Sequence, residues 1–303
     1  MSLRARLVSS VLRRTLKRQM ASFDDHRAMR SRAGASMGRT PREVAIETLD
    51  AGGVPAERVR WAGAGGDRVM LYLHGGGYVF GSPDSHRGLA WRLARTCGCD
   101  VLMADYRLAP EHPFPAAVDD AFAAYQWLLA QGNDPQHIIV AGDSAGGGLA
   151  VALMVKLKEE GVPLPAAAAL LSPWTDLTLS GASVQTYAHA DAMLSPESLR
   201  KFRDLYLGDA DPASPLASPL FADLSALPPV YIAVGSTEVL RDDSQRLADA
   251  LREAGGEVEL ELWPDMPHVF PLLSSLIPEG QQAIDHIAAF LHRHRAAATA
   301  SAA

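Results

Sequence analysis

Short apolar segments alternate with longer amphipathic segments over most of this chain. The apolar segments are long enough for strands buried on both faces of a sheet, and they cover residues 69–73, 101–104, 138–143, 167–171 and 230–234. Helical periodicity fills the stretches of about 85–97, 116–130, 144–160, 242–254 and 281–294. This alternation predicts a parallel sheet that helices cover on both faces.

Four further stretches add to this pattern. Residues 44–49 and 58–61 are short strand candidates separated by a glycine-rich turn, which predicts a hairpin. Residues 258–263 alternate glutamate with apolar side chains, as expected of a last strand with a solvated face. Residues 176–216 carry short helical patterns and form a predicted insertion. We therefore predict an α/β fold with a mostly parallel central sheet of about eight strands.

The first twenty residues are basic and have apolar residues at helical spacing. Such a helix lies either on a membrane surface or, with its apolar stripe folded inward, against its own domain. We expect the second arrangement. No uninterrupted apolar segment follows, so we expect neither a secretion signal nor an integral membrane segment.

Composition and charge narrow the classes of partner. The chain has 303 residues, of which 48% are hydrophobic and 21% charged, which is typical of a globular protein of one large domain, 1–303. A net charge of −7 argues against a nucleic-acid partner. Cys97 and Cys99 are too close in sequence for an ordinary disulfide, which favours a reduced, cytoplasmic protein.

The strand at 138–143 leads into a glycine-flanked serine, Ser144, and then directly into a helix. This order predicts a nucleophile elbow, in which Gly142 and Gly146 leave room for a strained turn and the helix N-terminus stabilises negative charge at the serine. Ser36 also stands in a Gly-x-Ser-x-Gly pattern, but no strand precedes it and no helix follows. We therefore predict that Ser36 lies in a loop.

Three consecutive glycines, residues 75–77, follow the buried strand at 69–73. Glycine lets backbone N–H groups approach a ligand closely, which suits an oxyanion hole. The alternatives are a plain glycine turn and a phosphate-binding loop. The second is disfavoured because the chain has neither a Gly-x-Gly-x-x-Gly pattern nor a P-loop lysine here, and no helical pattern begins directly at the glycines.

The carboxyl ends of the later strands should hold the partners of the serine. His268 follows strand 258–263, and we predict it as the general base because it comes last in the order serine, acid, histidine. Glu238, Asp242 and Asp243 all follow strand 230–234. We favour Glu238 as the acid because the two aspartates fall where the first turn of a helix prefers acidic residues.

Three motifs in order resemble those of the hormone-sensitive lipase family of α/β-hydrolases, the bacterial family IV esterases in particular. They are His74-Gly75-Gly76-Gly77, residues 105–116, and Gly142-Asp143-Ser144-Ala145-Gly146-Gly147. The resemblance implies that Gly75, Gly76 and Ala145 donate the oxyanion-hole N–H groups. It also implies a helical cap formed by about 1–42 and 176–216. Members often have aspartate where this chain has Glu238.

These residues predict a serine carboxylesterase (a carboxylic ester hydrolase) that forms an acyl-enzyme. The family resemblance implies short- to medium-chain acyl esters, and we expect no metal and no cofactor. An amidase or formamidase with the same triad is the alternative, and a binding protein without chemistry is a weaker one. The expected partner is a small-molecule ester, and the last strand is a possible homodimer edge.

Overall fold

The computed structural model describes residues 1–22, 40–63 and 66–294. At its centre is an eight-stranded sheet with the strand order β1-β2-β4-β3-β5-β6-β7-β8. β2 runs antiparallel to both of its neighbours, and all the remaining neighbouring pairs are parallel. The predicted α/β fold, the mostly parallel sheet and the hairpin of the first two strands are therefore confirmed.

The strands are β1 (Val44–Asp50), β2 (Pro55–Trp61), β3 (Val69–Leu73), β4 (Asp100–Ala104), β5 (Ile138–Asp143), β6 (Ala167–Leu171), β7 (Val230–Gly235) and β8 (Val258–Trp263). The helices are α1 (Leu3–Arg14), α2 (Leu16–Ser22), α4 (Pro83–Cys97), α5 (Ala116–Ala130), α6 (Ala145–Glu159), α7 (Ser183–Thr186), α8 (Pro196–Leu207), α9 (Arg241–Glu253) and α10 (Pro278–Arg293). Short 3-10 helices lie at Pro135–His137, Pro219–Phe221 and Phe270–Leu273.

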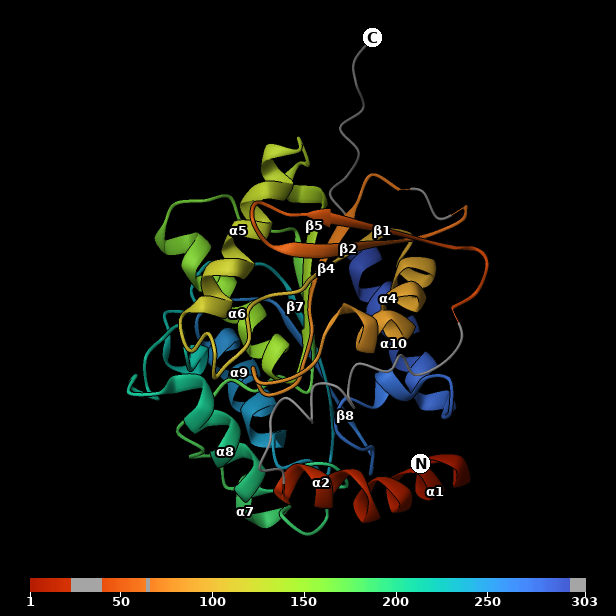
Figure 1. Cartoon of the computed structure of the whole chain (residues 1–303), viewed down its shortest axis with the longest axis vertical. Coiled ribbons are helices and arrows are strands. Elements are labelled where there is room, and N and C mark those ends of the chain that lie inside the picture. Colours follow the sequence, from red (N-terminus) through yellow and green to blue (C-terminus); the bar gives the residue numbers. More distant parts are fainter. Residues whose placement is uncertain (23–39, 64–65, 295–303) are drawn as a thin grey trace.

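Alternate residues of the buried strands serve two separate apolar layers. Leu71 and Val140 pack into the layer that α5, α6 and α9 cover, whereas Met70 and Ile139 pack into the layer under α4 and α10. Figure 1 shows these two groups of helices on opposite sides of the sheet. Because both faces are covered, the central strands need apolar residues at every position, which is the pattern seen in the sequence.

Two helices begin a few residues earlier than their periodicity predicts. α4 begins at Pro83 because Ser82 and Ser85 form a capping box, in which each hydroxyl accepts the other residue's backbone N–H. α10 begins at Pro278. Both starts have proline in the first turn, where its missing N–H leaves no hydrogen bond unmade.

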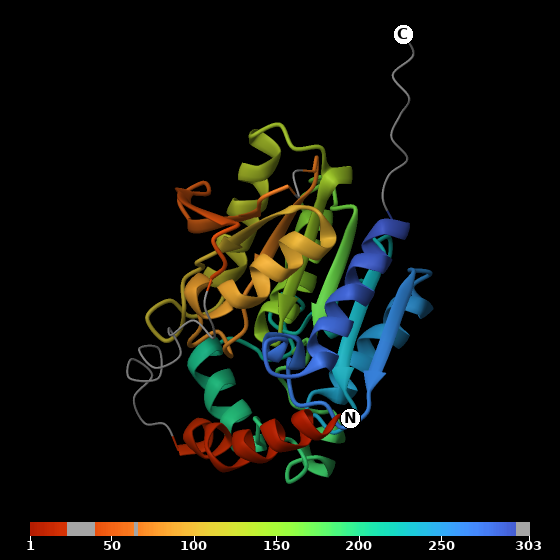
Figure 2. The same cartoon turned by 90° about the vertical axis from the view of Figure 1, so that its right-hand side faces the viewer.

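The N-terminal helices α1 and α2 lie along one end of the molecule, beside α7 and α8 (Figures 1 and 2). Ala5 of α1 packs against Phe270, and Met20 of α2 packs into the large core layer. The predicted inward folding of the apolar stripe is confirmed for this face only. A second face of α1, with Leu3 and Leu7, is exposed.

The insertion after β6 is tied to the first turn of α9. Asp243 Oδ2 accepts hydrogen bonds from the Thr175 N–H at 2.8 Å and the Asp176 N–H at 2.9 Å. Asp242 Oδ2 accepts one from the Ser183 N–H at 2.9 Å. Both aspartates begin α9 as predicted, but their carboxylates bind the insertion instead of capping their own helix.

Parts of the predicted organisation fall outside the described residues. Ser36 and a section of the predicted cap segment 1–42 lie there, so the division into a domain and a cap of 1–42 and 176–216 stays a prediction. Within 1–22, 40–63 and 66–294, no helix combines the length and apolar character that crossing a bilayer requires.

We expect Asp243→Ala to destabilise the fold by about 2–4 kcal/mol, because it leaves two buried N–H groups without an acceptor. Denaturant unfolding measures this change. Asp249→Ala, which removes an exposed carboxylate from the same helix, is the matched control and should change stability by less than about 0.5 kcal/mol. Equal stability of the two variants would contradict the assigned role of Asp243.

Candidate active site

Ser144 lies in a sharp turn between β5 and α6, with φ 52° and ψ −121°. A side chain at Gly142 would collide with the carbonyl oxygen of Gly146, and one at Gly146 would collide with that of Leu73. Only glycine fits these two positions. Its lack of a side chain lets the backbone of the turn contact itself and the end of β3 directly. The predicted elbow geometry is present, and Ser144 stands at the N-terminus of α6, as a charge-stabilising position requires.

His268 follows β8 and reaches the serine across the carboxyl edge of the sheet. Its Nε2 lies 2.9 Å from Ser144 Oγ, and its Nδ1 lies 2.7 Å from Glu238 Oε2. Both His268 and Glu238 are buried. The arrangement fits an imidazole whose Nδ1–H donates to the carboxylate and whose Nε2 accepts the serine proton.

The Glu238 carboxylate is fixed from its other side as well. Its Oε1 accepts hydrogen bonds from Ser172 Oγ at 2.8 Å and from the Gly235 N–H at 2.5 Å. Ser172 also accepts the Val269 N–H at 3.2 Å. One serine therefore connects the loop of the acid with the loop of the histidine, a role that no motif in the sequence indicates.

Burial and charge act in opposite directions on this pair. Burial lowers the pKa of the His268 imidazole, but the charge and hydrogen bond of Glu238 outweigh it and hold that pKa above 6.5. Burial raises the pKa of the Glu238 carboxyl, and the contact with His268 works against that rise. The imidazole is thus a stronger base than a free histidine.

The glycine loop offers donors beside the serine, but they differ from the predicted set. The Gly75 N–H donates to Asp143 Oδ1 at 2.9 Å, so it is engaged and not open to a ligand. Within the described ranges, the N–H groups of Gly76, Gly77 and Ala145 have no acceptor in the protein. The N–H groups of Gly76 and Ala145 are thus open, as the predicted oxyanion hole requires, whereas the Gly75 N–H is engaged and the Gly77 N–H is a further open donor.

Asp143 secures the glycine loop. Besides the Gly75 N–H, its carboxylate accepts the Tyr72 hydroxyl at 2.7 Å and lies 3.3 Å from His86 Nε2. Burial raises the pKa of Asp143, but the charge of His86 outweighs it and the pKa falls below its ordinary value. Burial likewise lowers the pKa of His86, and Asp143 outweighs it, so that pKa rises. The two side chains form a buried ion pair.

Sequence reasoning missed this pair because His86 is far from Asp143 in the chain and has no motif of its own. The only signal was the place of Asp143, directly before the serine. His74, which begins the glycine motif, has a different role. Burial lowers its pKa to about 3, and its ring stacks on Tyr106 with centroids 4.3 Å apart, so it is a neutral packing residue.

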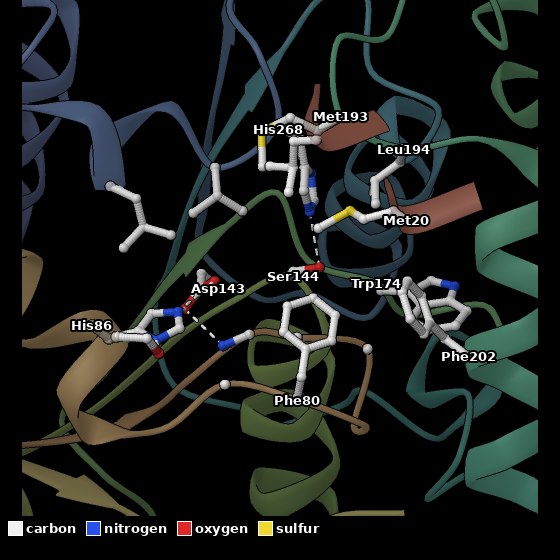
Figure 3. A pocket seen from close by; sticks show the side chains of 18 of the residues that line it. Met20, Phe80, His86, Asp143, Ser144, Trp174, Met193, Leu194, Phe202 and His268 are labelled. Carbon is white, nitrogen blue, oxygen red and sulfur yellow. Dashed lines mark hydrogen bonds and ion pairs between the residues drawn. The ribbon is translucent and has the colours of Figure 1, made fainter. Parts of the chain in front are cut away.

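Ser144 opens into an apolar cavity of about 260 Å³ (Figure 3). Phe80, Trp174, Leu194 and Phe202 contribute to its wall, and Met20 of α2 reaches in from the N-terminal helices. The glycine loop and His268 complete the lining. The serine therefore meets a ligand in a mostly apolar space. Among the described residues, no group of three or more histidine, cysteine or acidic side chains could hold a metal ion.

The sequence also matches a known protein family and a named relative. A family described as having the alpha/beta hydrolase fold matches residues 70–272. An acetyl-hydrolase of Streptomyces hygroscopicus is 48% identical over 259 residues, which cover 86% of this chain and 85% of that protein.

Solved structures match over almost the whole chain. An esterase of the bacterial hormone-sensitive lipase family is 44% identical, with a TM-score of 0.91 and coverage of 98% of this chain and 99% of that one. A structure of EstE5 soaked with p-nitrophenyl butyrate is 40% identical, with a TM-score of 0.94 and coverage of 98% and 100%.

Proposed function

This chain belongs to the alpha/beta hydrolase family, in its hormone-sensitive lipase group, and from this membership we propose that it is a serine carboxylesterase. One observation carries the proposal. A continuous hydrogen-bonded series runs from Glu238 through His268 to Ser144, and Ser144 lies beside open N–H donors in an apolar cavity. Such an arrangement suits acyl transfer from an ester to water.

The reaction begins with proton transfer. Ser144 Oγ attacks the ester carbonyl carbon while its proton moves to His268 Nε2, and the carbonyl π electrons move onto oxygen. The resulting oxyanion accepts hydrogen bonds from the N–H groups of Gly76, Gly77 and Ala145. The N-terminus of α6 adds a favourable dipole at the same place. Glu238 stays ionised and positions the imidazolium.

The intermediate then collapses and the bond to the alcohol oxygen breaks. His268 gives its proton to that oxygen, the alcohol leaves, and the acyl group remains on Ser144. A water molecule gives a proton to His268 Nε2 and attacks the acyl carbon through a second oxyanion. Collapse of this intermediate releases the carboxylic acid, and the proton on His268 returns to Ser144 Oγ.

The cavity supports esters with short to medium acyl chains. Its wall is mostly apolar, and its volume of about 260 Å³ suits a small acyl group better than a long one. The names of two relatives also point to short acyl groups, since one is named an acetyl-hydrolase and another was soaked with a butyrate ester. An amidase with the same triad is the second candidate, because its chemistry needs the same groups.

Assembly and location stay proposals. β8 ends the sheet and pairs only with β7 among the described strands, so its outer edge offers free backbone groups for a second copy. The two cysteines, Cys97 and Cys99, are free and buried, which supports a cytoplasmic location.

The first prediction of the proposed function concerns substrate class. A p-nitrophenyl ester series should give high kcat/KM on acetate, butyrate and hexanoate and a steep fall toward palmitate, because the cavity is small. Ser144→Ala should lower kcat by roughly four to six orders of magnitude. An anilide of matching acyl group is the control. Faster hydrolysis of the anilide than of the ester would favour the amidase.

The second prediction separates the three carboxylates. Glu238→Gln should lower kcat by up to about four orders of magnitude, because the imidazole loses the anion that orients it. The general base must be neutral, so activity falls as pH drops below the pKa of His268. Without Glu238 that pKa is lower, and the acidic limb should shift to lower pH.

Asp242→Asn is the matched control for Glu238→Gln and should stay within about tenfold of the parent, because its remaining oxygen still accepts the Ser183 N–H. Thermal melts confirm that both variants fold. If folded Asp242→Asn loses its activity and Glu238→Gln does not, the acid is assigned to the wrong residue.

The third prediction is a dimer through β8. Light scattering across micromolar concentrations should give twice the chain mass, and replacing Leu262 on this strand with lysine should return the monomer. A monomer mass for the parent at every concentration would rule the dimer out.

A further inference from the structure

One face of α1 exposes large apolar side chains to solvent. Leu3, Leu7 and Val11 are 82%, 68% and 52% exposed, and their four-residue spacing places them in one stripe. Exposed large hydrophobic residues are otherwise scattered: of the eight among the described residues, four fall within the first eleven positions of the chain. An apolar stripe of this kind marks an interaction surface.

Basic residues border this stripe. By helical geometry Arg4 lies beside the stripe and Arg14 lies one turn beyond it, whereas Arg6 lies farther round the helix, next to a hollow that Arg13 also lines; all three are exposed. No acidic residue occurs in the first 22 positions, although the whole chain carries a net charge of −7. The positive charge is therefore concentrated where the apolar stripe is exposed.

The opposite side holds α1 firmly against the protein. Arg13 Nη2 donates to the Ala190 carbonyl oxygen at 2.7 Å, and the Ser2 N–H donates to Glu279 at 2.5 Å. Ala5 is buried against the 3-10 helix at Phe270–Leu273. The inner face of α1 thus contacts the protein, with Val8 and Leu12 partly buried, and the outer face is presented on a fixed helix.

We propose that the outer face of α1 docks on an anionic lipid surface, with the helix lying in the plane of the interface. Leucine and valine enter the boundary between headgroups and acyl chains, while the flanking arginines pair with lipid phosphates. A second copy of this chain fits less well. A two-fold contact through this face would set the same arginines against one another.

Docking in this way has a consequence for substrate access. α1 continues into α2, whose Leu16 and Met20 line the cavity at Ser144. A docked protein holds this wall of the cavity close to the lipid, where esters of low water solubility dissolve. Binding itself needs no catalysis, so this proposal does not depend on the proposed function.

Co-sedimentation with sucrose-loaded vesicles tests the proposal. The parent protein should bind vesicles of phosphatidylcholine with phosphatidylglycerol, and bind pure phosphatidylcholine much more weakly. The variant Leu3→Gln/Leu7→Gln/Val11→Gln should bind at least about tenfold more weakly. Arg4→Gln/Arg6→Gln/Arg14→Gln should lose roughly a hundredfold on the anionic vesicles and keep its weak binding to the neutral ones.

The matched control is Ile46→Gln/Phe221→Gln, which removes two exposed apolar residues from other elements and should bind as the parent does. All variants should hydrolyse p-nitrophenyl acetate at the parental rate, which separates lost docking from lost folding or lost catalysis. The proposal is overturned if the parent does not bind anionic vesicles, or if the variant Leu3→Gln/Leu7→Gln/Val11→Gln binds them as well as the parent does. It is also overturned if light scattering shows a dimer that only the variant Leu3→Gln/Leu7→Gln/Val11→Gln, among the variants tested, abolishes.

Discussion

The positive φ of Ser144 is the constraint on which the rest of the site depends. A non-glycine residue at φ 52° and ψ −121° is strained, and the strain is tolerated because Gly142 and Gly146 allow their backbones to touch their neighbours. The turn that results ends a buried strand and begins a helix within one residue. It therefore sets the hydroxyl at the edge of the sheet and at the N-terminus of α6.

Sheet order does the remaining positioning. β7 runs parallel to β6 and β8 runs parallel to β7, so the loops that follow β7 and β8 open at the same edge as the elbow. Ser172 then joins the loop of Glu238 to the loop of His268. On the other side of the serine, Asp143 and His86 hold the glycine loop through the Gly75 N–H. The nucleophile thus stands between two hydrogen-bonded supports, each built from residues far apart in the chain.

What the sequence could predict follows from this division. Local periodicity predicts the order of strands and helices. Ser144, Glu238 and His268 lie within a few residues of the ends of their strands, so the sequence could also predict the three catalytic candidates. The partner of the Gly75 N–H was not, because it depends on where the side chain before the serine points. The sequence could not distinguish the two faces of α1 either. Leu3 and Leu12 are both apolar, and only packing makes the first exposed and the second partly buried.

The central claim is that Ser144 is the one nucleophile and that its reactivity comes from this geometry. The most direct measurement is labelling with a fluorophosphonate probe, followed by peptide mapping of the adduct by mass spectrometry. The account predicts a single adduct on Ser144 that disappears in Ser144→Ala. An adduct on Ser36, or undiminished labelling of Ser144→Ala, would contradict it.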